Sequence, residues 1–185
     1  MNAIELMIAE HVNIRRMLTV LRKFSYELMK DPGTDVSDVP KMIEFVRQYA
    51  DKHHHGKEED LLFNRMEEHL GAAAQKLVRH GMLVEHDLGR LHIKLLEEAI
   101  EDFKAGNDEA RLDIIGNAIA YTQLLDRHIT KEDDMVYQFA WRHFDEKMIL
   151  TINNETIQFE EQAENEGTQQ YYLSLLEKLE EKYVK

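Results

Sequence analysis

Apolar residues recur at intervals of three and four along most of the chain, as Ile4, Met7, Ile14, Leu18 and Leu21 do within the first thirty residues. This spacing places them on one face of an α-helix. No stretch alternates between apolar and polar residues as a strand with flanking turns would. The pattern therefore predicts an all-α protein. We expect helices over about residues 2–30, 37–69, 72–105, 109–143 and 146–184.

Short breakers separate the first four helices, namely Asp31-Pro32-Gly33, Gly71 and Gly106-Asn107. Long helices joined by short loops predict an up-down-up-down four-helix bundle. The fifth segment is richer in Glu and Lys, and we expect interruptions near Asn153-Asn154 and Glu166-Gly167. We divide the chain into a bundle, residues 1–145, and a C-terminal helical extension, residues 146–185, that packs on the bundle or on a partner subunit.

Composition narrows the classes of partner and chemistry. A chain of 185 residues suits one compact domain, and its net charge of -13 disfavours nucleic acid and anionic membranes as partners. The absence of cysteine excludes disulfides, thiolate metal sites and iron–sulfur clusters. No apolar run approaches the ~18 residues of a membrane helix, and no signal-peptide pattern is present, so we expect a cytoplasmic location.

Histidine placement gives the strongest chemical signal. Ten histidines are present, and each of the first four predicted helices carries one on its apolar face. Two of these are followed four residues later by a glutamate, and residues at this spacing lie on one helix face. Imidazole and carboxylate together suit iron, zinc or manganese. The candidate metal ligands are His11, His54, Glu58, His86, His128 and Glu132.

The positions of these histidines within their helices agree to within a turn, so antiparallel packing would bring them to one level. A single core histidine more often bonds a backbone carbonyl, and one H-x-x-x-E pair is common on an exposed helix. Burying two glutamates without a partner is costly, however, and a metal offsets that cost. His55 with Glu59 forms a second H-x-x-x-E pair, so spacing alone leaves the register open between His54/Glu58 and His55/Glu59.

Four segments resemble the hemerythrin-like, HHE cation-binding domain family. They are Glu10-His11-x-x-Ile14-Arg15, the HHxKEExxLF motif from His54, the segment Met82–Arg90 around His86, and the LLxxHIxKED motif from Leu124. The resemblance implies a four-helix bundle with two iron ions (Fe2+/Fe3+, with an oxo or hydroxo bridge), for which manganese or zinc could substitute. It implies His11 and His54 on one iron, His86 and His128 on the other, and bridging Glu58 and Glu132.

One departure from the family pattern bears on function. The oxygen-carrying members resembled here use two histidines four residues apart on the third helix, but Met82 and Arg90 stand on either side of His86. We therefore expect one iron to lack a fifth histidine and to be more open. Four residues are expected to lie around the ligands: Tyr121, Arg90, Glu85 and Tyr49. Glu85, next to His86 in the sequence, could instead replace the missing ligand if its side chain reorients. Tyr121 could donate a hydrogen bond or act as a redox-active tyrosine near bound oxygen, or it could be a core aromatic residue with no such role. Arg90 could pair with a carboxylate near the metal, or form a purely structural salt bridge.

The resulting hypothesis is a non-haem di-iron protein that binds or reacts with O2, NO or peroxide. The alternatives are a di-iron oxidoreductase, such as a peroxidase or NO-handling enzyme, and an iron storage or sensor module. We also expect a redox partner, and a protein that is either a monomer or a homodimer. Whether the chain is an enzyme stays open at this point.

Overall fold

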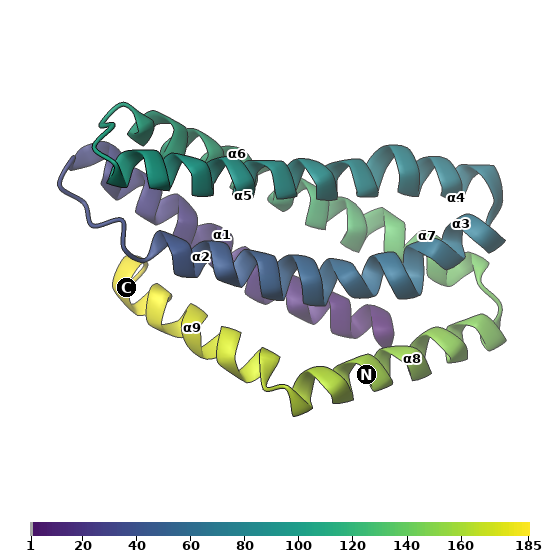
Figure 1. The fold of residues 1–185 in the computed structure, drawn as a ribbon. Helices are drawn as coiled ribbons and strands as arrows, with labels where there is room; N and C mark the ends of the chain where they lie inside the picture. The colour runs from purple at the N-terminus through teal and green to yellow at the C-terminus, as the bar shows by residue number, and fades with distance from the viewer. Residues whose placement is uncertain (1) are drawn as a thin grey trace.

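The computed structural model describes residues 2–185, and within them the chain is helical throughout, without strands. The all-α prediction is confirmed. Four helical rods form the bundle, and a bent arm follows them (Figure 1). The rods are α1 (Ala3–Lys30); α2 (Val39–Phe45), η1 (Val46–His55), η2 (Glu58–Phe63) and α3 (Asn64–His69); α4 (Gly71–Leu77), η3 (Val78–Met82) and α5 (Leu83–Lys104); and α6 (Ala110–Lys131), η4 (Glu132–Val136) and α7 (Tyr137–His143). The arm is α8 (Glu146–Asn165) and α9 (Thr168–Tyr183).

Glycines close three of the turns between these elements. Gly71, Gly106 and Gly167 have φ of 76°, 100° and 72°, in the region that costs L side chains most. The first helix begins with a capping box, in which the side chain of Asn2 accepts from the amide of Glu5 and the side chain of Glu5 accepts from the amide of Asn2. The breakers predicted from the sequence therefore act as turns.

The interruption expected at Asn153-Asn154 does not occur, because α8 continues unbroken to Asn165. Asn153 has a tertiary partner instead: its side-chain oxygen accepts from the backbone N–H of Ala3 at 2.9 Å. An asparagine that bonds a neighbouring helix end need not turn its own backbone. The break at Glu166-Gly167 does occur, between α8 and α9.

Segments of π-helix mark the middle of the bundle. The elements η1, η2 and η4 are π-helical and hold His54, Glu58 and Glu132 respectively. A π-turn takes more residues per turn than an α-turn and is frequent at functional sites. Its wider winding helps three consecutive histidines, His53 to His55, to be buried together at 3%, 1% and 4% exposure.

Two apolar clusters fill the bundle on either side of this level. One includes Phe24, Phe45 and Leu125, and the other includes Met7, Phe63 and Ala140. The histidines and glutamates lie between the two clusters, so the core contains one buried polar layer. That layer is shielded from water by apolar packing at both ends.

The arm formed by α8 and α9 lies along the side of the bundle away from α5 and α6 (Figure 1). It packs on α1 and on the second rod through α2, η1 and η2. No helix within residues 2–185 combines the length and apolar character needed to cross a membrane.

Candidate metal centre

The six predicted ligands meet in the polar layer, although they come from four separate rods. Each is at most 1% exposed. The antiparallel arrangement brings the single histidines of α1 and α5 to the level of the two H-x-x-x-E pairs. The predicted ligands are thus brought together in one buried site.

Ligand atoms gather in two groups, each spanning no more than 4.8 Å. His11, His54, Glu58 and Glu132 form the first group. His55, Glu58, His86 and His128 form the second. Glu58 belongs to both groups. Glu132 reaches toward both as well, with one oxygen 3.3 Å from His11 Nε2 and the other 3.1 Å from His128 Nε2.

A fifth histidine, His55, joins the second ligand group beside the predicted ligands. It comes from the second rod, whereas the oxygen-carrying members of the family place their additional histidine on the third helix. Its ring stacks on that of His86, with centroids 3.8 Å apart and an interplanar angle of 7°. The two registers left open by spacing are not alternatives, because His54 and His55 both face the layer while Glu59 lies behind His86.

The imidazole nitrogens are spaced as ligands of shared ions. His11 Nε2 and His54 Nε2 are 2.8 Å apart, and His86 Nε2 and His128 Nε2 are 3.1 Å apart. Two imidazoles that bind one ion at about 2.0–2.1 Å place their nitrogens roughly 3 Å apart. The Nδ1 atoms of these rings face carboxylates, so each Nε2 of the neutral ring carries a lone pair. Facing lone pairs repel each other unless a proton or a metal ion lies between them.

The two glutamates carry oxygen atoms without a partner among residues 2–185. Glu58 Oε2 and both carboxylate oxygens of Glu132 are buried and accept no hydrogen bond. Burial and the adjacent charge of Glu132 raise the pKa of Glu58 well above its usual range. Burial also opposes ionisation of Glu132, but His128 and His11 keep its pKa well below the usual range. Buried unpaired carboxylate oxygens are costly, and a divalent cation is the partner that this donor set fits.

Each histidine of the layer is held from behind by a carboxylate at Nδ1. The distances are 2.7 Å for His11 to Asp133, 2.8 Å for His54 to Glu10, 3.3 Å for His55 to Asp51, 2.6 Å for His86 to Glu59 and 3.0 Å for His128 to Glu85. Such carboxylates fix the ring orientation and the tautomer, and they raise the basicity of a metal-binding imidazole.

The sequence contained a signal for these outer carboxylates that the histidine pattern alone missed. Glu10, Glu85, Glu59 and Asp133 each stand directly beside a ligand in the sequence. Each then bonds a histidine on a different rod, as Glu10 does with His54 and Glu85 with His128. An acidic residue next to a buried ligand therefore holds the histidine ligand of a neighbouring helix in place.

The predicted neighbours Glu85, Arg90 and Tyr49 take different places. Glu85 bonds His128 and Lys131, so it is turned away from the position of a replacement ligand. Arg90 bonds Asp51, Glu59 and Asp87, none of which belongs to either ligand group. The hydroxyl of Tyr49 accepts a hydrogen bond from the side chain of Asn13 at 3.0 Å.

Tyr137, which the sequence analysis did not select, lies closer to the centre than Tyr49. It is 1% exposed, its hydroxyl donates to Glu58 Oε1, and it lies 3.4 Å from His11 Nε2. Its sequence position could have identified it, because Tyr137 follows Glu132 by five residues and a π-turn brings residues at that spacing onto the same helix face.

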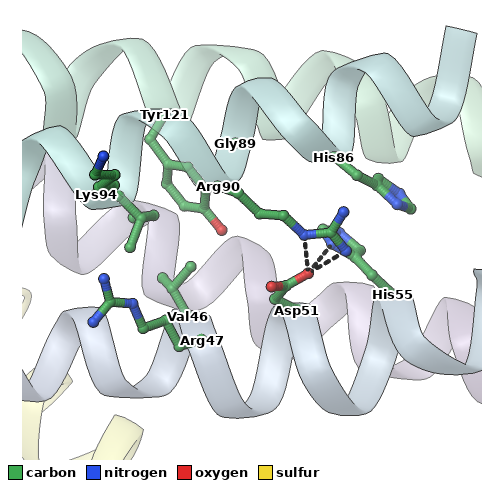
Figure 2. Close-up of a pocket in the computed structure, with 10 residues that line it drawn as sticks. Val46, Arg47, Asp51, His55, His86, Gly89, Arg90, Lys94 and Tyr121 are labelled. Atoms are coloured by element: carbon green, nitrogen blue, oxygen red, sulfur yellow. Dashed lines mark hydrogen bonds and ion pairs between the residues drawn. The ribbon is translucent and has the colours of Figure 1, made fainter. Parts of the chain in front are cut away.

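A cavity of about 410 Å³ leads from the surface between η1 and α5 to the second ligand group. Figure 2 shows His55 and His86 at one end and the hydroxyl of Tyr121 directed into the space, with Arg90 and Asp51 paired beside it. Gly89 lines the wall; a Cβ there would lie 3.3 Å from Leu125 Cδ2, tighter than most real contacts. The missing side chain at Gly89 thus lets α5 pack closely against Leu125 and Tyr121 of α6.

Fold and site together define a helical-bundle metal protein with a buried histidine and carboxylate centre. A comparison with family models matches residues 2–140 to the hemerythrin HHE cation binding domain. The chain therefore belongs to the hemerythrin HHE cation-binding family, whose members bind metal ions, typically iron. No curated protein and no solved structure matches the chain.

Proposed function

We propose that the chain holds two iron ions in this centre and uses them to bind or react with O2, NO or peroxide. The observation that carries the proposal is the pair of ligand groups that share Glu58 and are spanned by Glu132. Two iron ions held there would supply redox electrons and coordination positions for a small ligand. Manganese or zinc could occupy the same donors.

The protein residues have separable tasks in this function. The five histidines provide neutral donors, and the carboxylates behind them set the ring orientation. The hydroxyl of Tyr137 donates to Glu58 and so limits the directions in which that carboxylate can turn. The cavity beside Gly89 offers a small molecule a route to the His55 side of the centre.

The experiment starts with metal-free protein that is loaded with Fe(II) without oxygen and then exposed to air. We expect two iron ions per chain and new visible absorbance on oxidation. His54→Ala and His128→Ala should each lose most of the metal, whereas His143→Ala, an exposed histidine of α7, should keep both ions. A stoichiometry of zero in the parent protein, or of two in both ligand variants, would contradict the proposal.

A di-iron oxidoreductase is the second candidate, because the cavity is larger than a diatomic gas requires. Rapid turnover of peroxide or NO with an added electron donor would favour an enzyme. Reversible O2 release without turnover would favour a carrier or sensor. Iron that accumulates beyond two ions per chain would favour storage.

A further inference from the structure

A buried lysine lies directly behind the centre, where the arm meets the bundle. Lys57 is 0% exposed and stands next to the ligand Glu58 in the sequence. Its ammonium donates to Glu10 from α1 and to Glu160 from α8, and lies 3.2 Å from His53 Nε2. A buried cation needs paired charges, and two carboxylates from different elements provide them here.

Glu10 is shared between this lysine and a metal ligand. One of its oxygens faces Lys57 and His53, and the other bonds His54 Nδ1 at 2.8 Å. The two oxygens belong to one carboxylate, so the charge of Glu10 is divided between Lys57 and His53 on one side and His54 on the other. The strength of the Glu10 bond to His54 therefore depends on how much of the lysine charge Glu10 alone must balance.

Glu160 supplies the second negative charge, and it comes from outside residues 2–140 that match the family. It accepts from Lys57, lies 3.5 Å from His53 Nε2, and is held on its other oxygen by Gln169 of α9. The adjacent Phe159 covers the lysine, with the ammonium 5.6 Å from the ring centroid. The arm thus completes the surroundings of Lys57.

We infer that Glu160 is a positioning residue for the metal ligand His54. It neutralises Lys57, so that Glu10 keeps its full strength as the acceptor for His54. Without Glu160, the whole charge of the lysine would fall on Glu10 and weaken its hold on the imidazole. The C-terminal arm is then a working part of the metal centre. This inference rests on the proposed function only in assuming that His54 binds metal.

The other outer carboxylates do not depend on the arm. Glu59 and Asp51 pair with Arg90, and Glu85 pairs with Lys131, all within the bundle and closer to solvent. Only the Glu10 pair is buried and extended by a residue of α8. The effect of Glu160 should therefore be confined to the first ligand group.

The test is Glu160→Gln, which preserves shape and removes the charge. Loss of a residue that supports a metal ligand from behind typically lowers metal affinity 10- to 100-fold, and we expect about 10-fold for Fe(II) at one of two sites. Anaerobic Fe(II) titration against a competing chelator measures this. Glu155→Gln on the same helix, which breaks a pair with Arg65 away from the centre, is the matched control and should leave both affinities unchanged.

Thermal melting of the metal-free variants separates positioning from folding. If Glu160→Gln is too unstable to titrate, Glu160→Asp is used instead, because it keeps the negative charge. This variant should bind Fe(II) within about two-fold of the parent. A Glu160→Asp protein that folds and still loses affinity overturns the inference. Parent-like affinity in folded Glu160→Gln also overturns it. Absence of metal in the parent itself would instead contradict the proposed function.

A second, independent feature lies on the outer face of α5. Four apolar side chains recur there at spacings of four, three and four residues: Val84, Leu88, Leu91 and Leu95 are 45%, 41%, 46% and 36% exposed. This spacing is the seam of a coiled coil and not a scatter of single apolar residues. Asp87 and Lys94 flank the seam on one side; their side chains are 77% and 67% exposed, and each has one ion-pair partner within α5, Arg90 and Glu98 respectively.

We propose that this seam is the contact between two copies of the chain, with the two α5 helices antiparallel about a two-fold axis. In that arrangement Leu88 packs on Leu91 of the second copy, and Val84 packs on Leu95. The flank that carries Asp87 and Lys94 on one helix then lies against the same flank of the other helix. Asp87 of each copy therefore faces Lys94 of the other copy, which gives two equivalent pairs. The charges are self-complementary, as a two-fold contact requires.

Sedimentation velocity over a range of concentrations tests this contact. We expect a dimer that weakens with dilution, and a monomer for Leu91→Lys. Leu112→Lys, at the 68% exposed Leu112 of α6, is the control and should leave the dimer intact. Asp87→Lys should weaken association, and adding Lys94→Asp should restore it. A parent that stays monomeric, or a Leu91→Lys variant that still dimerises, overturns the proposal.

Discussion

Asp133 Oδ1 lies 2.7 Å from Nδ1 of His11, although 122 residues separate the two along the chain. Asp133 follows the ligand Glu132 directly, so one turn of η4 supplies a ligand and the support for a ligand on α1. This arrangement ties the orientation of the first histidine to the fourth rod. We therefore expect substitution of Asp133 to weaken metal binding.

Asp133→Asn is expected to lower the affinity for the metal bound by His11 about 10- to 100-fold, the usual cost of losing a carboxylate behind a metal-binding imidazole. The fold should survive, because the side chain of Asp133 is 28% exposed. Metal titration with chelator competition measures the change. The exposed neighbour Asp134 provides the control, and equal affinities for Asp133→Asn and Asp134→Asn would refute the role.

His55→Ala tests whether the fifth imidazole binds metal. If it does, the ion at the second ligand group loses a donor, and its affinity and its absorption spectrum change while the first ion is retained. His92→Ala is the control, because His92 bonds Asn117 and lies outside both ligand groups. Parent-like spectra and stoichiometry in His55→Ala would show that His55 is only a wall of the cavity.

Metal removal is expected to destabilise the protein, because buried carboxylate oxygens of Glu58 and Glu132 then remain without a partner. A ligand at about 100 times its dissociation constant adds roughly 2.7 kcal/mol. For a chain of this size that corresponds to a melting temperature about 5–10 °C higher. Calorimetry with and without Fe(II) under anaerobic conditions measures the difference, and identical melting curves would count against a metal in the layer.

Asp38 bonds Lys182 and Tyr183 of the arm, and its contribution to the free energy of unfolding should depend on pH in the acid range. Burial opposes its ionisation, but hydrogen bonds from Lys182, Lys41 and Tyr183 lower its pKa from 3.8 to about 2. A lowered pKa in the folded state stabilises the protein above the unfolded value of 3.8, and this contribution is lost as the pH falls through about 2.

Asp38→Asn should therefore cost about 1–2 kcal/mol of unfolding free energy at neutral pH and almost nothing near pH 2. Urea unfolding of both proteins at several pH values measures the difference. Asp113→Asn, at an exposed position of α6, is the control. A cost for Asp38→Asn that stays constant down to pH 2 would show that the carboxylate charge is not responsible.

The sequence by itself predicted the helical class, the helix breaks at Gly71, Gly106 and Gly167, and the six candidate ligands that meet in the polar layer. These features depend on local rules: the spacing of apolar residues, the conformational freedom of glycine and the shared face of residues four apart. The expected break at Asn153 was wrong because local rules could not foresee its partner, Ala3.

Only the tertiary structure decided what surrounds the ligands. His53, His54 and His55 are identical residues in one run, yet the packed neighbours direct them toward Glu160, His11 and His86 respectively. Which of them reaches the centre depends on the helices that pack on each side of η1. The support of His11 by Asp133 follows the same rule, because contacts between rods are set by how the rods assemble and not by spacing within any one of them.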